Sequence, residues 1–289
     1  MARVHLSQIS CEVNMASRTL KRVLAPVMAL AIFVALCETT AAESLTIGAP
    51  PSLRGAFEEL VPMFEQEYGV EVRVRYTPSK TLLRQIEKGA RIDVFVSAGV
   101  EEVDELYKKR LTLNGRPRIL AETSIVLVMS ADSTAPLISF RNALGDHRTL
   151  IALANPHMSY LGEVTARVLT KLYPTYKSRE HILYASHSEE VLDLVRTGKA
   201  DLGLVYRANM ISHGDVRMSD EIPIGHDVVI AFAQTVVSTC DISLRSLAAQ
   251  FSDFLMTPRI QLLLMKHGFD PPHVGPTRVK GVGRSSKGD

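Results

Sequence analysis

Two serines follow predicted strands at points where a helix begins, and their surroundings suit the binding of an anion. Ser52 follows a strand predicted at 45–47, and Ser79 follows a strand predicted at 71–76. A helical pattern starts directly after each serine. The first turn of a helix has unpartnered N–H groups at the positive end of the helix dipole, and a serine there adds a hydroxyl donor. Two such turns converging from one sheet would form an anion pocket.

Other interpretations of the same residues compete with this one. Serine is favoured at helix N-caps whatever a protein binds, so Ser52 and Ser79 could have only a capping role. A hydrolase would need a nucleophile beside a base, and neither serine has a histidine within its local motif, although a distant partner remains an alternative. His157 and His187 do not have the spacing of metal ligands, so no metal site is predicted. Ser186 with Glu189 resembles a capping box.

Short apolar strands alternate with amphipathic helices along most of the chain. In the helix predicted at 53–68, apolar residues recur at helical spacing, namely Phe57, Leu60, Val61 and Phe64. Glutamates lie on the other side of this helix. Such alternation predicts an α/β protein with parallel, doubly wound sheets. Further strands are predicted at 93–97, 150–153 and 202–206, and two terminal helices at 243–256 and 258–267.

Two long β-runs, at 123–129 and 228–237, indicate how the chain is divided. A strand much longer than its neighbours can cross between two lobes, and these two bracket a central segment. The prediction is a first lobe made of 43–122 and 228–274, a second lobe made of 123–227, and a ligand cleft between them. The alternative is a single continuous sheet.

The N-terminal segment has the order of a secretory signal peptide. Arg18, Lys21 and Arg22 precede an uncharged run at 23–36, and small residues follow at 40–42. We expect residues 1–42 to be a signal peptide cleaved near Ala42, which would place the mature protein in the periplasm. A retained membrane anchor is the alternative, although the run is shorter than the roughly 20 residues a span needs. The Gly-rich tail at 275–289 is predicted to be disordered.

The expected mature chain has a balanced charge and a single thiol. Removing residues 1–42 takes Lys plus Arg from 33 to 29 and Asp plus Glu from 31 to 29. A net charge near zero argues against a nucleic-acid partner. Only Cys240 would remain of the 3 cysteines, so no internal disulfide is expected and the fold must depend on its hydrophobic core.

Several motifs taken together resemble the periplasmic molybdate-binding proteins, the solute-binding components of molybdate ABC importers. These motifs are the strand and turn at 45–53, the segment 79–90 with its Thr-Leu-Leu-Arg-Gln-Ile-Glu-Lys-Gly-Ala run, the strand at 92–98, and the Gly-Leu-Val-Tyr of 203–206. Asn155-Pro156, Gly162 and the closing helix at 259–269 follow in the family's order. The resemblance covers nearly all of 44–270. It implies a two-lobed periplasmic solute-binding protein with an interlobe cleft.

The resemblance also implies a ligand, a partner and a set of site residues. The ligand would be molybdate or tungstate, with no cofactor and no catalysis, and the partner would be the membrane permease of an ABC importer. The protein would be a monomer. The pocket would consist of neutral donors, which suits a dianion that only accepts hydrogen bonds. Its residues would be Ser52, Ser79, Leu161, Ser188 and Tyr206, with Leu161 and Ser188 contributing backbone N–H groups.

The chain departs from the family pattern at two places near the site. Pro50-Pro51 replaces small residues and removes two N–H groups from the loop before Ser52. Lys80 stands where a small or polar residue is usual, and we interpret it as a solvated surface charge beside the site. These departures keep open a second candidate ligand, another tetrahedral oxyanion such as sulfate. A sensor domain of a transcription regulator is less favoured, because the sequence has a signal peptide and no DNA-binding motif.

Overall fold

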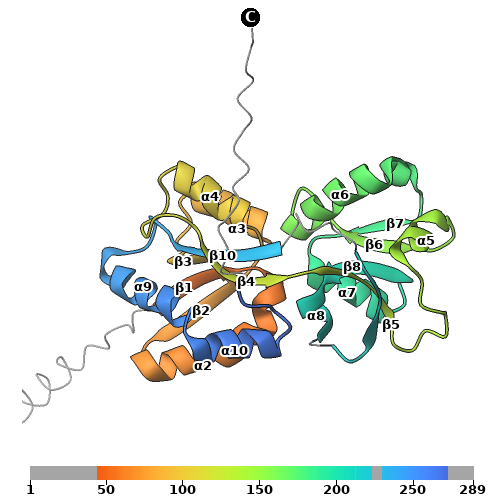
Figure 1. Ribbon diagram of the computed structural model, residues 1–289. Helices are drawn as coiled ribbons and strands as arrows, with labels where there is room; N and C mark the ends of the chain where they lie inside the picture. Colours follow the sequence, from red (N-terminus) through yellow and green to blue (C-terminus); the bar gives the residue numbers. More distant parts are fainter. Residues whose placement is uncertain (1–43, 212, 223–229, 273–289) are drawn as a thin grey trace, which may run out of the picture. The chain divides into compact units, whose positions relative to one another are not determined.

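The computed structural model describes residues 44–211, 213–222 and 230–272, which form two α/β lobes (Figure 1). Each lobe is built on a five-stranded sheet. The predicted signal peptide at 1–42 and tail at 275–289 lie outside the described residues. Among the described helices, none combines the length and the apolar character needed to cross a membrane.

The first lobe has the strand order β2-β1-β3-β10-β4. Its strands are β1 (Ser44–Ala49), β2 (Glu71–Tyr76), β3 (Val94–Ser97), β4 (Arg118–Thr123) and β10 (Ile230–Val236). On one face lie α2 (Arg54–Tyr68), α9 (Arg245–Phe254) and α10 (Pro258–Lys266), and on the other lie α3 (Ser79–Glu87) and α4 (Val100–Lys108). The apolar spacing predicted for α2 is confirmed, because Phe64 packs edge-on against Phe251 with ring centroids 4.9 Å apart.

The second lobe has the strand order β7-β6-β8-β5-β9. Its strands are β5 (Ile125–Ser130), β6 (Ile151–Ala154), β7 (Ile182–Ala185), β8 (Leu202–Tyr206) and β9 (Val216–Glu221). Its helices are α5 (Phe140–Gly145), α6 (Tyr160–Leu172), α7 (Ser188–Arg196) and α8 (Arg207–Ile211). In Figure 1, α6 lies on one side of this sheet and α7 and α8 on the other. Short 3₁₀ helices complete the described fold: η1 (Pro51–Leu53), η2 (Pro174–Ser178) and η3 (Ile242–Leu244).

Both sheets are mixed, so the prediction of parallel sheets holds for only part of each sheet. β10 is antiparallel to β3 and β4, and β5 is antiparallel to β8 and β9. The parallel strands of each sheet end at the side where the lobes meet. A chain that crosses over enters the new sheet from that side and must run against those strands. The two reversed strands are therefore a direct consequence of the crossings.

The run predicted as one strand at 123–129 is two strands in different sheets. β4 ends at Thr123 in the first sheet and β5 begins at Ile125 in the second, with Ser124 between them. The periodicity could not show this break, because the residues on both sides of Ser124 are buried and β-branched or apolar. The other predicted crossing, at 228–237, contains β10, and its residues 228–229 lie outside the described part of the chain.

Candidate functional site

Residues from both lobes line a single small pocket at the ends of the parallel strands, where helices begin. The lining residues are Pro50, Pro51, Ser52, Pro78, Ser79, Ala98, Ser159, Tyr160, His187, Ser188 and Tyr206. The first six belong to the first lobe and the others to the second. Four of the five predicted site residues line this pocket, and the fifth, Leu161, directly follows the lining residue Tyr160.

Helix N-termini supply the polar backbone groups around this pocket. Ser79 and Ser188 are the first residues of α3 and α7, and Leu161 is the second residue of α6. The N–H groups in a first turn have no acceptor within their own helix, and the helix dipole makes that end positive. The parallel strands direct these termini toward the same space. The arrangement suits an anion.

Neither serine of the first lobe caps a helix through its side chain, so the N-cap alternative is wrong for both. The N-cap positions are Pro50 before η1 and Pro78 before α3, and neither cap has a side-chain hydrogen bond. Ser79 Oγ instead accepts the Ala98 N–H at 3.0 Å, which leaves the hydroxyl hydrogen to donate elsewhere. Ser52 Oγ is buried and has no hydrogen-bond partner among the described residues.

The hydroxyl of Ser188 is occupied by the protein itself. Ser188 Oγ donates to Asn209 Oδ1 at 2.7 Å and accepts the Tyr206 N–H at 3.3 Å. Asn209 is buried, and its Nδ2 also donates to Glu189 and, at 3.5 Å, to the carbonyl of Ser52 in the other lobe. The hydrogen of the Ser188 hydroxyl is therefore already used within the protein. No feature of the sequence identified Asn209.

The phenol of Tyr206 is fully buried beside this network. Its ring packs edge-on against Phe232 at 5.6 Å between centroids, and its oxygen has no well-formed hydrogen bond among the described residues. Burial raises the pKa of Tyr206 well above its usual value, and the backbone N–H of Leu161 acts in the opposite direction. The phenol is therefore a neutral donor at any physiological pH. A buried donor without an acceptor costs about 1–3 kcal/mol, which a bound acceptor would recover.

The pocket is small, and its lining contains no carboxylate and no ammonium or guanidinium group. Its cavity volume is about 10 Å³, whereas sites for drug-sized organic molecules measure about 300–1,000 Å³. His187, which the sequence analysis weighed only as a metal ligand, lines the pocket as the N-cap of α7, where its Nδ1 accepts the Glu190 N–H at 3.4 Å. Burial lowers the pKa of His187, which favours the neutral imidazole. The neutral donors suit an anion, and the cavity in this structure has room for about one water molecule.

Two predictions next to α7 and α3 need correction. Ser186 pairs with Glu190 and not with Glu189, because its N–H and hydroxyl both donate to Glu190 Oε2. Lys80 is not a solvated surface charge: its side chain is 24% exposed and forms an ion pair with Glu163 of the other lobe. The sequence could not reveal this partner, which is remote in the chain.

Close packing between the lobes depends on Gly99. A Cβ atom at Gly99 would lie 2.5 Å from the ring of Tyr160 and 2.6 Å from Glu102 Oε2. The Gly99 N–H donates to Ser97 Oγ at 3.2 Å, and Ser97 Oγ donates to Glu102 Oε2 at 3.1 Å. Glu102 is only 3% exposed, and burial raises its pKa to about 7. Tyr160 of the second lobe thus packs directly over a buried acid of the first.

The buried acid predicts a specific pH dependence of stability. The pKa of Glu102 is about 7 in the fold, and its ordinary value is 4.5. The stability that the protonated Glu102 side chain gives the fold is therefore fully present below about pH 4.5 and is lost as the pH rises through 7. Relative to Glu102→Gln, the unfolding free energy should fall by about 2–3 kcal/mol between roughly pH 5 and pH 8.5. Chemical denaturation across this range measures it. Glu58→Gln, on an exposed position of α2, is the control, and parallel profiles for the wild type and Glu102→Gln would contradict the assignment.

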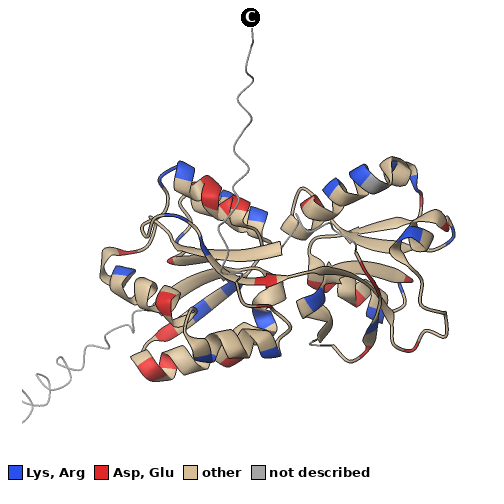
Figure 2. Ribbon diagram, viewed as in Figure 1, with Lys and Arg blue, Asp and Glu red and all other residues tan. Residues whose placement is uncertain are grey.

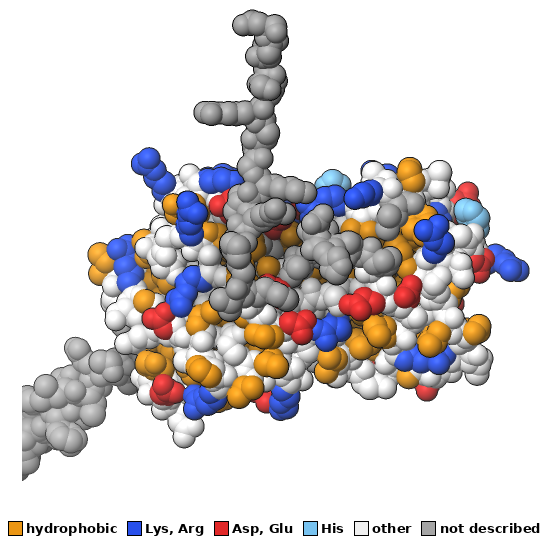
Figure 3. All heavy atoms as spheres, viewed as in Figure 1, with side chains coloured by type: hydrophobic (Ala, Val, Ile, Leu, Met, Phe, Trp, Pro, Cys, Tyr) orange, Lys and Arg blue, Asp and Glu red, His pale blue; other side chains and the backbone are white. Residues whose placement is uncertain are grey.

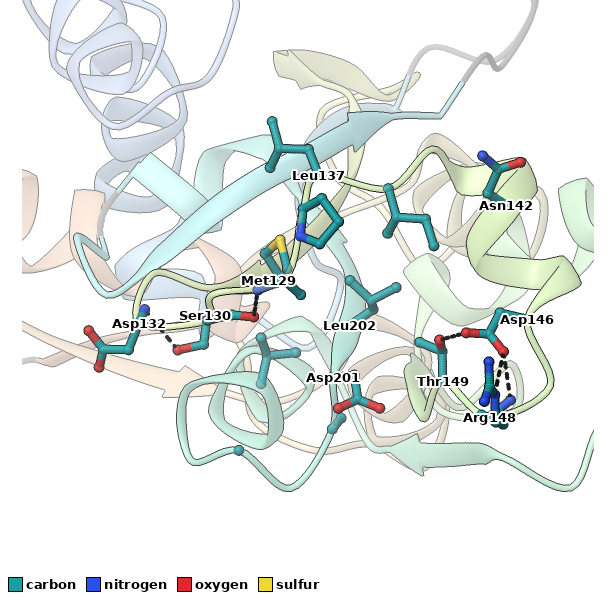
Figure 4. A pocket seen from close by; sticks show the side chains of 17 residues that line it. Met129, Ser130, Asp132, Leu137, Asn142, Asp146, Arg148, Thr149, Asp201 and Leu202 are labelled. Atoms are coloured by element: carbon teal, nitrogen blue, oxygen red, sulfur yellow. Dashed lines mark hydrogen bonds and ion pairs between the residues drawn. The ribbon is translucent and has the colours of Figure 1, made fainter.

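A larger cavity in the second lobe has a lining that disfavours the binding of an anion. It has a cavity volume of about 870 Å³ and lies between the segment 130–149 and the start of β8 (Figure 4). Its lining includes Asp132, Asp146 and Asp201, with Arg148 as its one basic residue. Three carboxylates would repel a dianion. Groups of His, Cys, Asp or Glu able to hold a metal ion are absent from the described residues.

On the face drawn in Figures 2 and 3, the charged side chains of the described residues form no continuous basic surface. Lys and Arg alternate with Asp and Glu along the helices of both lobes (Figure 2). On the face that Figure 3 shows, the two signs are interspersed among apolar and neutral side chains, without a continuous basic patch.

Comparison with known proteins agrees with this geometry. The chain is 28% identical over 227 residues to a putative ABC transporter substrate-binding lipoprotein of Bacillus subtilis, covering 78% of this chain and 86% of that protein. It is 28% identical over 237 residues to a molybdate-binding protein of Mycobacterium tuberculosis, covering 81% and 87%. Among solved structures, the substrate-binding domain of a putative molybdenum ABC transporter from Clostridium difficile aligns with a TM-score of 0.61 and 26% identity, covering 79% and 99%.

The match to a protein family covers both lobes and the site. A family model described as bacterial extracellular solute-binding protein matches residues 45–270, which contain every strand described above except the first residue of β1. The predictions of a two-lobed α/β fold and of a binding protein are confirmed at this level. The chain belongs to the family of bacterial extracellular solute-binding proteins.

Proposed function

We propose that this protein binds molybdate, or the similar tungstate, between its two lobes outside the cytoplasm and delivers it to the membrane permease of an ABC importer. The site residues are Ser52, Ser79 and Tyr206 through their hydroxyls, and Leu161 and Ser188 through their backbone N–H groups. The observation that carries the proposal is a set of hydroxyls without acceptors among the described residues: the oxygens of Ser52 and Tyr206 are buried and unpaired there, and the Ser79 hydroxyl keeps a hydrogen to donate. The names of the Mycobacterium tuberculosis relative and of the solved Clostridium difficile structure support the same ligand.

The chemistry of the pocket distinguishes between oxyanions. A fully deprotonated dianion only accepts hydrogen bonds, whereas phosphate near neutral pH carries a proton that needs an acceptor. The lining offers no carboxylate for that proton. Sulfate shares the charge and shape of molybdate but is smaller, so the space that the donors enclose around a bound anion decides between the two.

Competition calorimetry with molybdate, tungstate, sulfate and phosphate tests this proposal. Molybdate and tungstate should bind at one site with similar affinity, sulfate more weakly, and phosphate weakest of the four. Tight phosphate binding would contradict the pocket of neutral donors. No heat with molybdate or tungstate, together with tight sulfate binding, would favour the second candidate ligand.

The division of the chain follows from the same proposal. We assign 44–123 and 230–272 to the first lobe and 125–222 to the second, because β4, which ends at Thr123, pairs with β10 in one sheet and β5 pairs with β9 in the other. The protein acts as a monomer with a cleaved signal peptide. Sedimentation of the mature protein and N-terminal sequencing of the secreted form would test these two points.

A further inference from the structure

A basic side chain of α3 contacts the second lobe beside the pocket. Lys80 Nζ donates to the carbonyl of Pro156 at 3.1 Å and forms an ion pair with Glu163, near the start of α6. The side chains of Lys80 and Glu163 are 24% and 39% exposed, so water screens this pair only in part. An ammonium that also binds a carbonyl is held in a defined position.

A second basic side chain of α3 reinforces the contact one turn further along. Arg84 Nη1 donates to the carbonyl of His157 at 3.3 Å, and its Nη2 donates to Thr81 Oγ1 at 3.2 Å. The second bond orients the guanidinium toward the other lobe. Lys80 and Arg84 thus donate hydrogen bonds to two successive carbonyls of the turn that follows β6.

This turn is closed by its own hydrogen bonds and leads directly into α6. Asn155 Oδ1 accepts the His157 N–H at 2.8 Å, and the Asn155 carbonyl accepts the Ser159 N–H at 3.0 Å. A Cβ atom at Gly162 would lie 2.5 Å from backbone atoms of Ala154 and Asn155, so α6 begins tightly against the turn. A force on the turn therefore moves the start of α6.

The contact connects donors of opposite lobes without belonging to the pocket. Lys80 follows Ser79 at the start of α3, and Glu163 lies two residues after Leu161 at the start of α6. Lys80 does not line the pocket, and its ammonium is already bound to Glu163 and Pro156. The charge of Lys80 therefore holds the starts of α3 and α6 together and supplies no hydrogen-bond donor to the anion.

We propose that Lys80, together with Glu163 and the carbonyl of Pro156, forms an interlobe clasp that sets how slowly the bound anion leaves. Lys80 is a positioning residue in this role, since it holds the donors of α3 and α6 around the anion without touching it. The proposal rests on the proposed function. A clasp that forms only when the lobes meet should change the dissociation rate and leave the first encounter with the anion nearly unchanged.

Stopped-flow kinetics with molybdate, followed by tyrosine fluorescence because the chain has 0 tryptophans, test the clasp. Lys80→Met should raise the dissociation rate roughly 10-fold, since it removes a charge-assisted bond and a partly exposed ion pair. Glu163→Gln should raise it about 3-fold. In the double variant, the dissociation rate should exceed that of Lys80→Met by less than the factor seen for Glu163→Gln alone. The dissociation rate of Lys80→Arg should lie between those of the wild type and Lys80→Met. Association rates should stay within about 2-fold.

Matched controls make the outcomes distinct. Lys88→Met removes the same charge from the C-terminal end of α3, where no interlobe contact is formed in the described residues, and should change neither rate. Unchanged dissociation in Lys80→Met would overturn the clasp. Abolished association would also overturn it, because Lys80 would then act as a ligand.

A measurement without ligand separates the clasp from the proposed function. The clasp should also stabilise the closed fraction of the unliganded protein, so small-angle scattering without ligand should show a larger radius of gyration for Lys80→Met than for Lys88→Met. If the wild type binds no molybdate, the proposed function fails. This scattering comparison alone then tests whether the clasp exists. Equal radii would then overturn it.

Discussion

Replacing Tyr206 with phenylalanine is expected to weaken molybdate binding roughly 10- to 150-fold, because a hydrogen bond to a charged acceptor contributes about 1.5–3 kcal/mol. The ring can keep its packing against Phe232. The phenol oxygen has no well-formed partner within the described protein, so its loss removes no internal bond. The unliganded variant should therefore melt at the same temperature as the wild type or slightly higher. Calorimetric titration and thermal unfolding measure the two effects separately.

The two pocket serines provide an internal contrast for this prediction. Ser52→Ala should behave like Tyr206→Phe, since Ser52 Oγ also lacks a protein partner. Ser79→Ala should lose affinity to a similar extent but also lower the stability of the unliganded protein, by about 1–3 kcal/mol, because the buried Ala98 N–H loses its acceptor. If Ser52→Ala and Tyr206→Phe bind molybdate as well as the wild type, these hydroxyls are not part of the site.

Adding one methyl group at Gly99 is expected to weaken molybdate binding by about 5- to 150-fold through a clash between the lobes. The new Cβ would lie 2.5 Å from the ring of Tyr160 in the opposite lobe. Overpacking of this kind costs about 1–3 kcal/mol, and each 1.4 kcal/mol is about tenfold in affinity. Gly99 has φ −135 and ψ 150, an extended conformation that alanine also adopts, so the backbone is not strained. The clash with Tyr160 arises only in the closed form, whereas the contact 2.6 Å from Glu102 Oε2, within the first lobe, would also lower the stability of the unliganded protein.

Scattering and a control glycine identify the cause of that loss. On addition of molybdate the wild type should become more compact, and Gly99→Ala should respond less at equal saturation. Gly145→Ala places a methyl group at a position with no neighbour within 4 Å and should leave affinity and compaction unchanged. Full affinity in Gly99→Ala would show that Tyr160 does not approach Gly99 in the liganded protein.

The order of the elements and their apolar faces could be predicted from local sequence. Helical spacing identified α2, and the turn from strand to helix identified Ser52 and Ser79, because both signals depend on neighbouring residues. The two crossings were also visible as apolar runs. Their direction within each sheet was not, since a strand that runs against its neighbours has the same composition as one that runs with them.

The sequence by itself determined which groups of the candidate site could serve as donors, and the tertiary structure decided how each is used. Ser188 and Ser79 carry the same hydroxyl, yet one donates to Asn209 and the other accepts the Ala98 N–H and keeps its hydrogen. Lys80 contacts the other lobe through Glu163. The two residues are too far apart in the sequence for any local pattern to connect them. Hydrogen-bond partners and burial depend on residues brought together only by folding. For that reason the two serine-containing turns and the family resemblance predicted an anion pocket, and only the fold showed which of its hydroxyls have partners among the described residues.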